Sequence, residues 1–222
     1  MSALISSSGG KDSLMAFQRA QQQGFNITTI VMMFDETGER SRSHGIGPEL
    51  AQAQANSLGC ELIMPSASWS EYQPTFISTL KTLADTGHTH AIFGDIDLQP
   101  HRDWEEKVCA LANIEPVLPL WGQDRVALST EALTMGLDAI VVCVDSKFLS
   151  DDFVGRRYDQ SFLADLPEGV DWCGENGEFH TFVTNAPFMA TPLSVHVTDL
   201  RPYIATPNFG GGRYCFASLA LT

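Results

Sequence analysis

The chain has 222 residues, of which 44% are hydrophobic, so it can form one large α/β domain with a smaller appendage. Its 13 basic and 27 acidic residues give a net charge of −14, which argues against a nucleic-acid partner, because phosphates need cations to neutralise them. No stretch reaches the roughly 18 apolar residues of a membrane-spanning helix, and the start lacks the basic segment of a signal peptide, so we expect a cytoplasmic protein with no membrane partner.

The first two-thirds of the chain alternate short apolar runs with helical patterns. We expect strands, in chain order, over residues 3–6, 27–34, 61–64, 90–93 and 139–144. The helices expected between them cover residues 12–23, 48–58, 71–85 and 102–112, and Ser129 or Thr130 is expected to cap a further short helix. Strands separated by such helices predict an α/β fold with a parallel, doubly wound, Rossmann-like sheet.

The pattern changes after about residue 150. Two strand-like runs, residues 193–200 and 214–221, are separated by a stretch rich in proline and glycine that includes Pro207 and residues 210–212. This spacing predicts a small C-terminal α+β element with antiparallel pairing. We therefore expect a nucleotide-binding domain over 1–147 and an acceptor-site element over 148–222.

A glycine-rich loop with the sequence SGGKDS connects the first expected strand to the first expected helix. Gly9 and Gly10 allow the main chain to approach an anion closely. The helix that follows directs free N–H groups and the positive end of its dipole at the same point. The hydroxyls of Ser8 and Ser13 add donors, and Lys11 adds a charge. The segment is therefore expected to bind the phosphates of ATP.

Asp12 is unusual beside a phosphate. Its carboxylate is expected either to cap the helix or to bind the Mg²⁺ that accompanies the triphosphate. A Walker A loop is excluded, because Ile5 occupies the first glycine position and Asp12 separates Lys11 from Ser13. The GxGxxG pattern of dinucleotide-binding folds is absent, which leaves a plain glycine-rich turn as the simpler alternative.

The SGGKDS segment resembles the SGGxDS loop of the PP-loop ATP pyrophosphatases, the adenine nucleotide α-hydrolase-like superfamily. The resemblance implies adenylation of an acceptor oxygen with release of pyrophosphate. His44 lies on the loop after the second strand, where this superfamily places the adenine edge, and Phe34 at the end of that strand is assigned to the nucleotide with it. A solvated loop histidine is the alternative for His44.

Two further segments narrow the resemblance. Gly94-Asp95-Ile96 and the GENGEFHT segment at residues 174–181 resemble the diphthine–ammonia ligase branch, over nearly the whole chain. That branch amidates a carboxylate with ATP and ammonium. The resemblance assigns phosphate binding to Ser8, Gly9, Gly10, Asp12 and Ser13, the nucleotide cleft to Gly94 and Asp95, and the acceptor side to Glu175, Glu178, His180 and Thr181.

We therefore expect an ATP-dependent ligase whose catalytic residues are Lys11, Asp12, Asp95, Glu175, Glu178 and His180. Its partners would be ATP with Mg²⁺, ammonium and a carboxylate-bearing acceptor, and it could form a homodimer. Glu175 and Glu178 can hold ammonium and accept its protons, while His180 can act as a base or a donor. The alternative for these three residues is a polar turn with a capping role.

Two other functions stay open. A PP-loop tRNA-modifying enzyme would use the same loop, but the five cysteines form no CxxC pair, which argues against the thiolating types. A nucleotide-binding regulator would bind ATP without turnover, although it would have no need of Asp12, Asp95 and Glu178.

Overall fold

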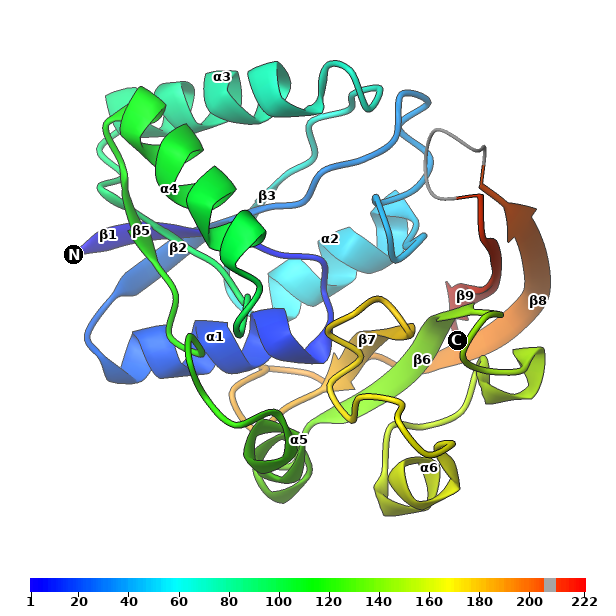
Figure 1. Ribbon diagram of the computed structural model, residues 1–222. Coiled ribbons are helices and arrows are strands. Elements are labelled where there is room, and N and C mark those ends of the chain that lie inside the picture. The colour runs from blue at the N-terminus through cyan, green and yellow to red at the C-terminus, as the bar shows by residue number, and fades with distance from the viewer. Residues whose placement is uncertain (206–210) are drawn as a thin grey trace.

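Two sheets make up the molecule (Figure 1), whose computed structural model describes residues 1–205 and 211–222. The first sheet is parallel, with the order β3-β2-β1-β4-β5. Its strands are β1 (Ser2–Ser6), β2 (Asn26–Val31), β3 (Glu61–Ile63), β4 (His90–Ile92) and β5 (Glu115–Val117). The crossover helices are α1 (Lys11–Gln22), α2 (Pro48–Ser57), α3 (Tyr72–Asp85) and α4 (Gln99–Ala112). The predicted α/β fold is confirmed.

Both faces of the parallel sheet are covered by helices, as Figure 1 shows. Side chains alternate along β1, so Leu4 packs with the α3 and α4 side while Ala3 and Ile5 pack with α1. Leu14 and Phe17 of α1 are almost fully buried in the same cluster as Ile5. This central position of β1 places the turn into α1 in the middle of the sheet edge, where open α/β sheets bind ligands.

The second sheet is antiparallel, with the order β7-β6-β9-β8. Its strands are β6 (Asp138–Asp145), β7 (Phe179–Asn185), β8 (Val195–Ile204) and β9 (Arg213–Leu221), and three short helices accompany it: α5 (Arg125–Thr134), η1 (Asp151–Phe153) and α6 (Gln160–Asp165). One hydrophobic cluster contains residues of α1, β6 and α6, so the two sheets share a core.

Several sequence-based expectations need correction. Residues 139–144 do form a strand, but β6 pairs antiparallel with β7 and β9 and is not part of the parallel sheet. A short run buried on both faces has no periodicity that distinguishes the two kinds of sheet. The expected division at residue 147 thus places β6 apart from its strand partners. Strands β5 and β7 were not expected, and Pro207 and Gly210 lie outside the described residues.

Helix boundaries differ in two places. The helix α5 begins with Asp124 as its N-cap, whose carboxylate accepts a hydrogen bond of 2.8 Å from the backbone N–H of Ala127, and not with Ser129 or Thr130. The helix α4 begins at Gln99, three residues before the expected start, because a proline fits its first turn. Within the described ranges, no helix combines the length and the apolar character needed to cross a membrane.

The β7 strand joins the second sheet to the SGGKDS loop. The backbone N–H of Val183 donates to the carbonyl of Gly9 over 2.9 Å. The side-chain amide of Gln54 donates to the same carbonyl over 3.1 Å and to the Val183 carbonyl over 2.7 Å. The loop is therefore held from one side by the second sheet.

Candidate active site

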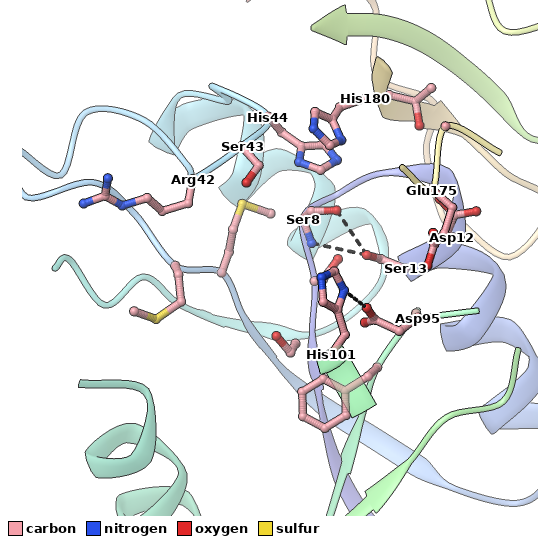
Figure 2. A pocket seen from close by; sticks show the side chains of 18 of the residues that line it. Ser8, Asp12, Ser13, Arg42, Ser43, His44, Asp95, His101, Glu175 and His180 are labelled. Carbon is pink, nitrogen blue, oxygen red and sulfur yellow. Dashed lines mark hydrogen bonds and ion pairs between the residues drawn. The ribbon is translucent and has the colours of Figure 1, made fainter. Parts of the chain in front are cut away.

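A cavity of about 630 Å³ opens at the carboxyl ends of β1, β2 and β4. The loop of residues 171–178 and the start of β7 close its other side, so both sheets contribute to it. Its lining brings together most of the residues singled out from the sequence (Figure 2): Ser8, Lys11, Asp12, Ser13, His44, Gly94, Asp95, Glu175, His180 and Thr181.

The SGGKDS loop wraps around the first turn of α1. Gly9 has a φ of +79°, in the left-handed region that favours glycine. The Ser8 and Ser13 hydroxyl oxygens lie 3.2 Å apart, and the Ser8 N–H donates to the Ser13 hydroxyl over the same distance. Gly10 is the N-cap of α1 and makes no side-chain capping bond, so the expectation that Asp12 caps the helix is wrong. The Thr181 hydroxyl accepts a hydrogen bond of 3.1 Å from the Lys11 backbone N–H, which leaves the later N–H groups of the first turn for an anion.

Lys11 is directed toward the loop of residues 171–178. Its Nζ donates to the Cys173 carbonyl and to the Asp12 carboxylate, the shorter contact with Asp12 being 2.8 Å. The rings of Tyr158 and Phe179 lie 5.4 and 5.6 Å from the ammonium group. Burial alone would lower the Lys11 pKa, but the Asp12 carboxylate, with smaller contributions from Tyr158 and Cys173, holds it above its ordinary value. Lys11 therefore stays charged and links the phosphate loop to the loop of residues 171–178, which precedes β7.

Gly94 allows the end of β4 to contact α1. A Cβ atom at this position would lie 2.9 Å from the Ser13 nitrogen and 3.0 Å from the Asp12 carbonyl carbon. At Gly10, a Cβ atom would approach the Thr181 carbonyl oxygen to 3.0 Å. Both glycines are thus required by close backbone packing around the loop, whatever ligand binds there.

The rings of two histidines, His44 and His180, pack against each other beside the loop, tilted by 37°. The ring centroids of His44 and His180 are 4.5 Å apart, and both rings line the cavity (Figure 2). Burial, followed by the charge of Lys11, lowers the His180 pKa to about 4. Burial, His180 and Lys11 together lower the His44 pKa well below its ordinary value. Both rings are therefore neutral near pH 7, and His44 is not a solvated loop residue.

An acidic corner, defined here as Asp95, Glu105 and Glu175, forms another part of the cavity. Asp95 accepts a hydrogen bond of 2.7 Å from His101 Nδ1 (Figure 2) and also shares a hydrogen bond with Glu105. Burial raises the Glu105 pKa to about 11, and the Asp95 contact adds to the shift. Burial, then the negative charge of Asp12, raises the Glu175 pKa to about 7. Glu175 also accepts a hydrogen bond of 3.2 Å from the Ile96 N–H.

Four predicted site residues do not line the cavity in the described structure: Gly9, Gly10, Phe34 and Glu178. Glu178 is 2% exposed, and its carboxylate accepts from the Asp171 N–H at 3.3 Å and from both the backbone and side-chain amides of Asn176 at 3.0 Å. This arrangement favours the turn-holding alternative for Glu178. Phe34 is fully buried in a hydrophobic cluster with Phe182, so its ring is a core element. Gly9 likewise contributes through its packing and its carbonyl oxygen.

Sequence reasoning missed Glu105 and the aromatic residues Tyr72 and Trp104 on the cavity wall. A signal for Glu105 was present. On α4 the buried side chains recur at Glu105, Val108, Cys109 and Ala112, so a carboxylate occupies a position on the apolar stripe of the helix. A charged residue at such a position is rarely buried unless something pairs with it.

The donor set fits a metal ion that arrives with a triphosphate. Across the described residues, no group of three or more histidines, cysteines or acids could hold a metal ion by itself. Asp12 lines the cavity beside the loop and offers one partly exposed carboxylate. One carboxylate together with phosphate oxygens and water is a common way to bind Mg²⁺.

The parallel sheet, the SGGKDS turn between β1 and α1 and the cavity at the strand ends define a nucleotide-binding α/β protein of the PP-loop type. A family model for the diphthamide synthase N-terminal domain matches residues 1–115, and one for the C-terminal domain matches residues 125–204. The chain belongs to the diphthamide synthase family. The resemblance stated from the sequence, to the diphthine–ammonia ligase branch of the PP-loop superfamily, is thereby confirmed.

Curated relatives carry the name diphthine–ammonia ligase. The protein from Danio rerio is 26% identical over 217 residues, which span 86% of this chain and 85% of that protein. The match to the Bos taurus protein is 30% identical over 105 residues, or 45% of this chain and 39% of that protein. The Homo sapiens protein is 29% identical over 100 residues, or 43% and 38% of the two chains.

One solved structure, described as a predicted subunit of a tRNA methyltransferase from Methanocaldococcus jannaschii, is also similar. It is 17% identical, covers 84% of this chain and 98% of its own, and superimposes with a TM-score of 0.47. A likeness at this distance carries no information about the substrate.

Proposed function

We propose that this protein is an ATP-dependent, amide-forming ligase that adenylates a carboxylate and then amidates it with ammonium. The observation that carries the proposal is the presence, in one cavity, of an anion-binding helix terminus and an acidic corner. The first suits a triphosphate and the second suits a cationic nitrogen donor. Membership of the diphthamide synthase family supports the same reaction.

ATP would place its phosphates against the SGGKDS loop. The first-turn N–H groups of α1 and the hydroxyls of Ser8 and Ser13 would donate to the phosphate oxygens. Asp12 would hold Mg²⁺, which supplies neutralisation of the phosphate charge when bound. The neutral imidazoles of His44 and His180 would add hydrogen-bond donors without adding charge, which is consistent with their lowered pKa values.

The reaction has two steps. An acceptor carboxylate oxygen bonds to the α-phosphorus, the bond between that phosphorus and the α–β bridging oxygen breaks, and pyrophosphate leaves. Ammonia then bonds to the acyl carbon, the bond from that carbon to the AMP oxygen breaks, and AMP leaves. Ammonium must lose a proton before it attacks. Glu175 suits this role, because its pKa of about 7 allows it to accept a proton near neutral pH.

The two alternatives are less well supported. All five cysteines are free and buried, and burial raises the pKa of Cys173, which lines the cavity, to about 11. A thiol in that state is a poor nucleophile, which disfavours sulfur transfer to tRNA. A regulator that binds ATP without turnover would have no use for the acidic corner.

Product analysis tests the proposal. The protein is incubated with ATP, Mg²⁺, ammonium and a diphthine-bearing acceptor protein, the substrate type that gives the relatives their name. We expect AMP, pyrophosphate and new amide in equal amounts, with pyrophosphate release but no amide when ammonium is left out. Formation of ADP and phosphate without AMP would contradict the ligase. Tight ATP binding without turnover would favour the regulator.

A further inference from the structure

Arg125 joins two loops that carry site residues. It is the first residue of α5, which lies beside the loop of residues 171–178 (Figure 1). On one side, its Nε and Nη2 atoms donate to the two oxygens of Asp97 over 2.8 and 2.5 Å. On the other side, Nη1 donates to Asp171 over 2.8 Å and to the side-chain oxygen of Asn176 over 3.3 Å. The planar guanidinium group thus links the β4–α4 connection to the loop of residues 171–178.

The Asp97 side of this link leads to the acidic corner. Asp95, two residues before Asp97, lines the cavity, and the N–H of Ile96 donates to the Glu175 carboxylate over 3.2 Å. The β4–α4 connection therefore contacts Glu175 at the cavity. Arg125 holds the same two segments together from outside, because it is not one of the described residues that line the cavity.

Asp171 connects Arg125 to the backbone of Glu175. Its Oδ2 atom accepts from Arg125 and also from the backbone N–H of Glu175 over 2.9 Å. Its Oδ1 atom accepts from the backbone N–H of Cys173 over 3.0 Å, and the Cys173 carbonyl accepts from Lys11 Nζ. The Asp171 carboxylate therefore orders the backbone of this loop, and Arg125 fixes the direction of that carboxylate.

The charges in this network are partly buried, which strengthens it. The side chains of Arg125 and Asp171 are 22% and 11% exposed, against 39% for Asp97. The hydrogen bond to Asp97, followed by the charge of Asp171, raises the Arg125 pKa above its ordinary value, so the guanidinium stays charged. Exposed single ion pairs contribute little to stability, whereas a charge shared between two carboxylates in a half-buried network contributes more. The Arg125 carbonyl also accepts from Cys173 Sγ over 3.1 Å, and this backbone contact remains when the side chain is changed.

We propose that Arg125 is a positioning residue that aligns Glu175 with the nucleotide side of the cavity for the amidation step. Adenylation of the acceptor needs the SGGKDS loop, whereas deprotonation of ammonium needs Glu175 in the right place relative to the adenylated acceptor. This assignment of a step rests on the proposed ligase function. The alignment of the loop of residues 171–178 by Arg125 does not, so the two can be tested separately.

Hydrogen exchange in the whole protein tests the alignment. In Arg125→Gln, the backbone amides of Cys173 and Glu175 should exchange about tenfold faster, because their carboxylate acceptor is no longer held in place. Arg213→Gln is the matched control, since Arg213 makes a similar two-oxygen pair with Asp151, over 2.7 and 2.6 Å, away from the cavity lining. Unchanged exchange in Arg125→Gln, or an equal increase at these amides in Arg213→Gln, would overturn the proposal.

Asp97→Asn provides a second test that does not depend on the folding of an Arg125 variant. It weakens one side of the link at a half-exposed position and leaves α5 and the Asp171 pair unchanged. We expect faster exchange at the amides of Cys173 and Glu175, by a smaller factor than in Arg125→Gln. Exchange equal to that of the wild-type protein would overturn the proposal.

Step-resolved kinetics then connect the alignment to the reaction. Arg125→Gln is expected to lower kcat for amide formation by roughly 10- to 100-fold, as small displacements of a reacting group do, and to leave KM for ATP and pyrophosphate release without ammonium within about threefold of wild type. Arg125→Lys should recover part of kcat, because an ammonium group can pair with one carboxylate but does not span both. Equal losses of adenylation and amidation, or a lysine variant no better than the glutamine variant, would overturn the assignment. If the wild-type protein makes no AMP at all, the ligase function fails, while hydrogen exchange still decides the alignment.

Discussion

The phosphate-loop wall of the cavity and its acidic corner differ in the charge and protonation of the groups that they present. At the loop, Ser8, Ser13 and His180 offer neutral hydrogen-bonding groups beside the Lys11–Asp12 ion pair, and burial keeps the imidazole uncharged. The acidic corner holds carboxylates, one of which stays protonated. Under the proposed function, the loop would hold the anionic substrate and the acidic corner the cationic one, within a single cavity.

The two regions also differ in how the chain builds them. The loop is one contiguous segment between β1 and α1, so its geometry follows from local sequence. The acidic corner is assembled from the end of β4, the second turn of α4 and the loop of residues 171–178. Changes at the loop should therefore affect nucleotide chemistry, and changes at the acidic corner should affect nitrogen transfer and pH dependence.

The largest effect is expected at Asp12. Asp12→Asn removes the carboxylate that balances the buried Lys11 charge and that would hold Mg²⁺. We expect AMP formation to fall by roughly 100- to 1000-fold, the usual loss for one electrostatic group at a reaction centre. Steady-state kinetics measure it, with Asp103→Asn on exposed α4 surface as the control. Activity within threefold of wild type would separate Asp12 from the chemistry.

The next largest effect is expected at Gly94, where the end of β4 contacts the backbone of α1. Gly94→Ala places a methyl group against the backbone of Asp12 and Ser13 and should push the first turn of α1 away from β4. We expect a loss of about 1–3 kcal/mol in the free energy of unfolding, together with weaker ATP binding, measured by denaturant titration and calorimetry. Gly47→Ala is the matched control, because a Cβ atom there meets nothing within 4 Å. Equal behaviour of the two variants would contradict the close contact.

The same change to glutamine should lower stability at Glu178 and slow amide formation at Glu175. Glu178→Gln disturbs a carboxylate that accepts three hydrogen bonds in a buried turn, so we expect it to cost about 1–3 kcal/mol in stability. Glu175→Gln should leave the melting temperature nearly unchanged and slow amide formation, because its carboxylate faces the cavity. Thermal melting and single-turnover amidation measure the pair. A stable but inactive Glu178→Gln would restore its predicted catalytic role.

A further effect concerns the pH dependence of stability. The Glu105 pKa is about 11 in the folded protein and near 4.5 when unfolded, so its contribution to stability is present below about pH 4.5 and is lost progressively as the pH rises. Glu105→Gln removes this loss, since the amide stays neutral. The melting temperature of the variant minus that of wild type should therefore increase from about pH 5 to about pH 9. A difference that is constant with pH would contradict the buried, protonated state.

The sequence predicted the parallel half of the fold well, because strand and helix alternate there with clear periodicity and glycine stops. It misplaced β6, whose buried run fits either kind of sheet, and it missed β5 and β7, the latter beginning at Phe179 within the GENGEFHT segment. The antiparallel pairing depends on contacts between residues far apart in the chain, such as Val144 with Cys215, which a single sequence does not reveal.

The candidate site, like the fold, was predicted from the sequence in some parts and not in others. The structure brings the loop residues, Asp95, Glu175, His44 and His180 into one cavity. The order of the parallel strands places the loop, His44 and Asp95 there, whereas Glu175 and His180 come from the second sheet, through the loop before β7 and β7 itself. It places Glu178 and Phe34 elsewhere, because the direction of a side chain in a turn or at a strand end depends on tertiary packing. Glu105 belongs to no motif, and its only signal in the sequence was its position on the apolar stripe of α4.

The central claim is that an acceptor carboxylate attacks the α-phosphorus of ATP in this cavity, and isotope transfer tests it most directly. An acceptor labelled with ¹⁸O in its carboxylate is turned over with ATP, Mg²⁺ and ammonium, and the AMP is analysed by mass spectrometry. Adenylation predicts one ¹⁸O atom from the acceptor in each AMP. AMP that carries no label from the acceptor, with an oxygen taken from solvent water in its place, would contradict the account.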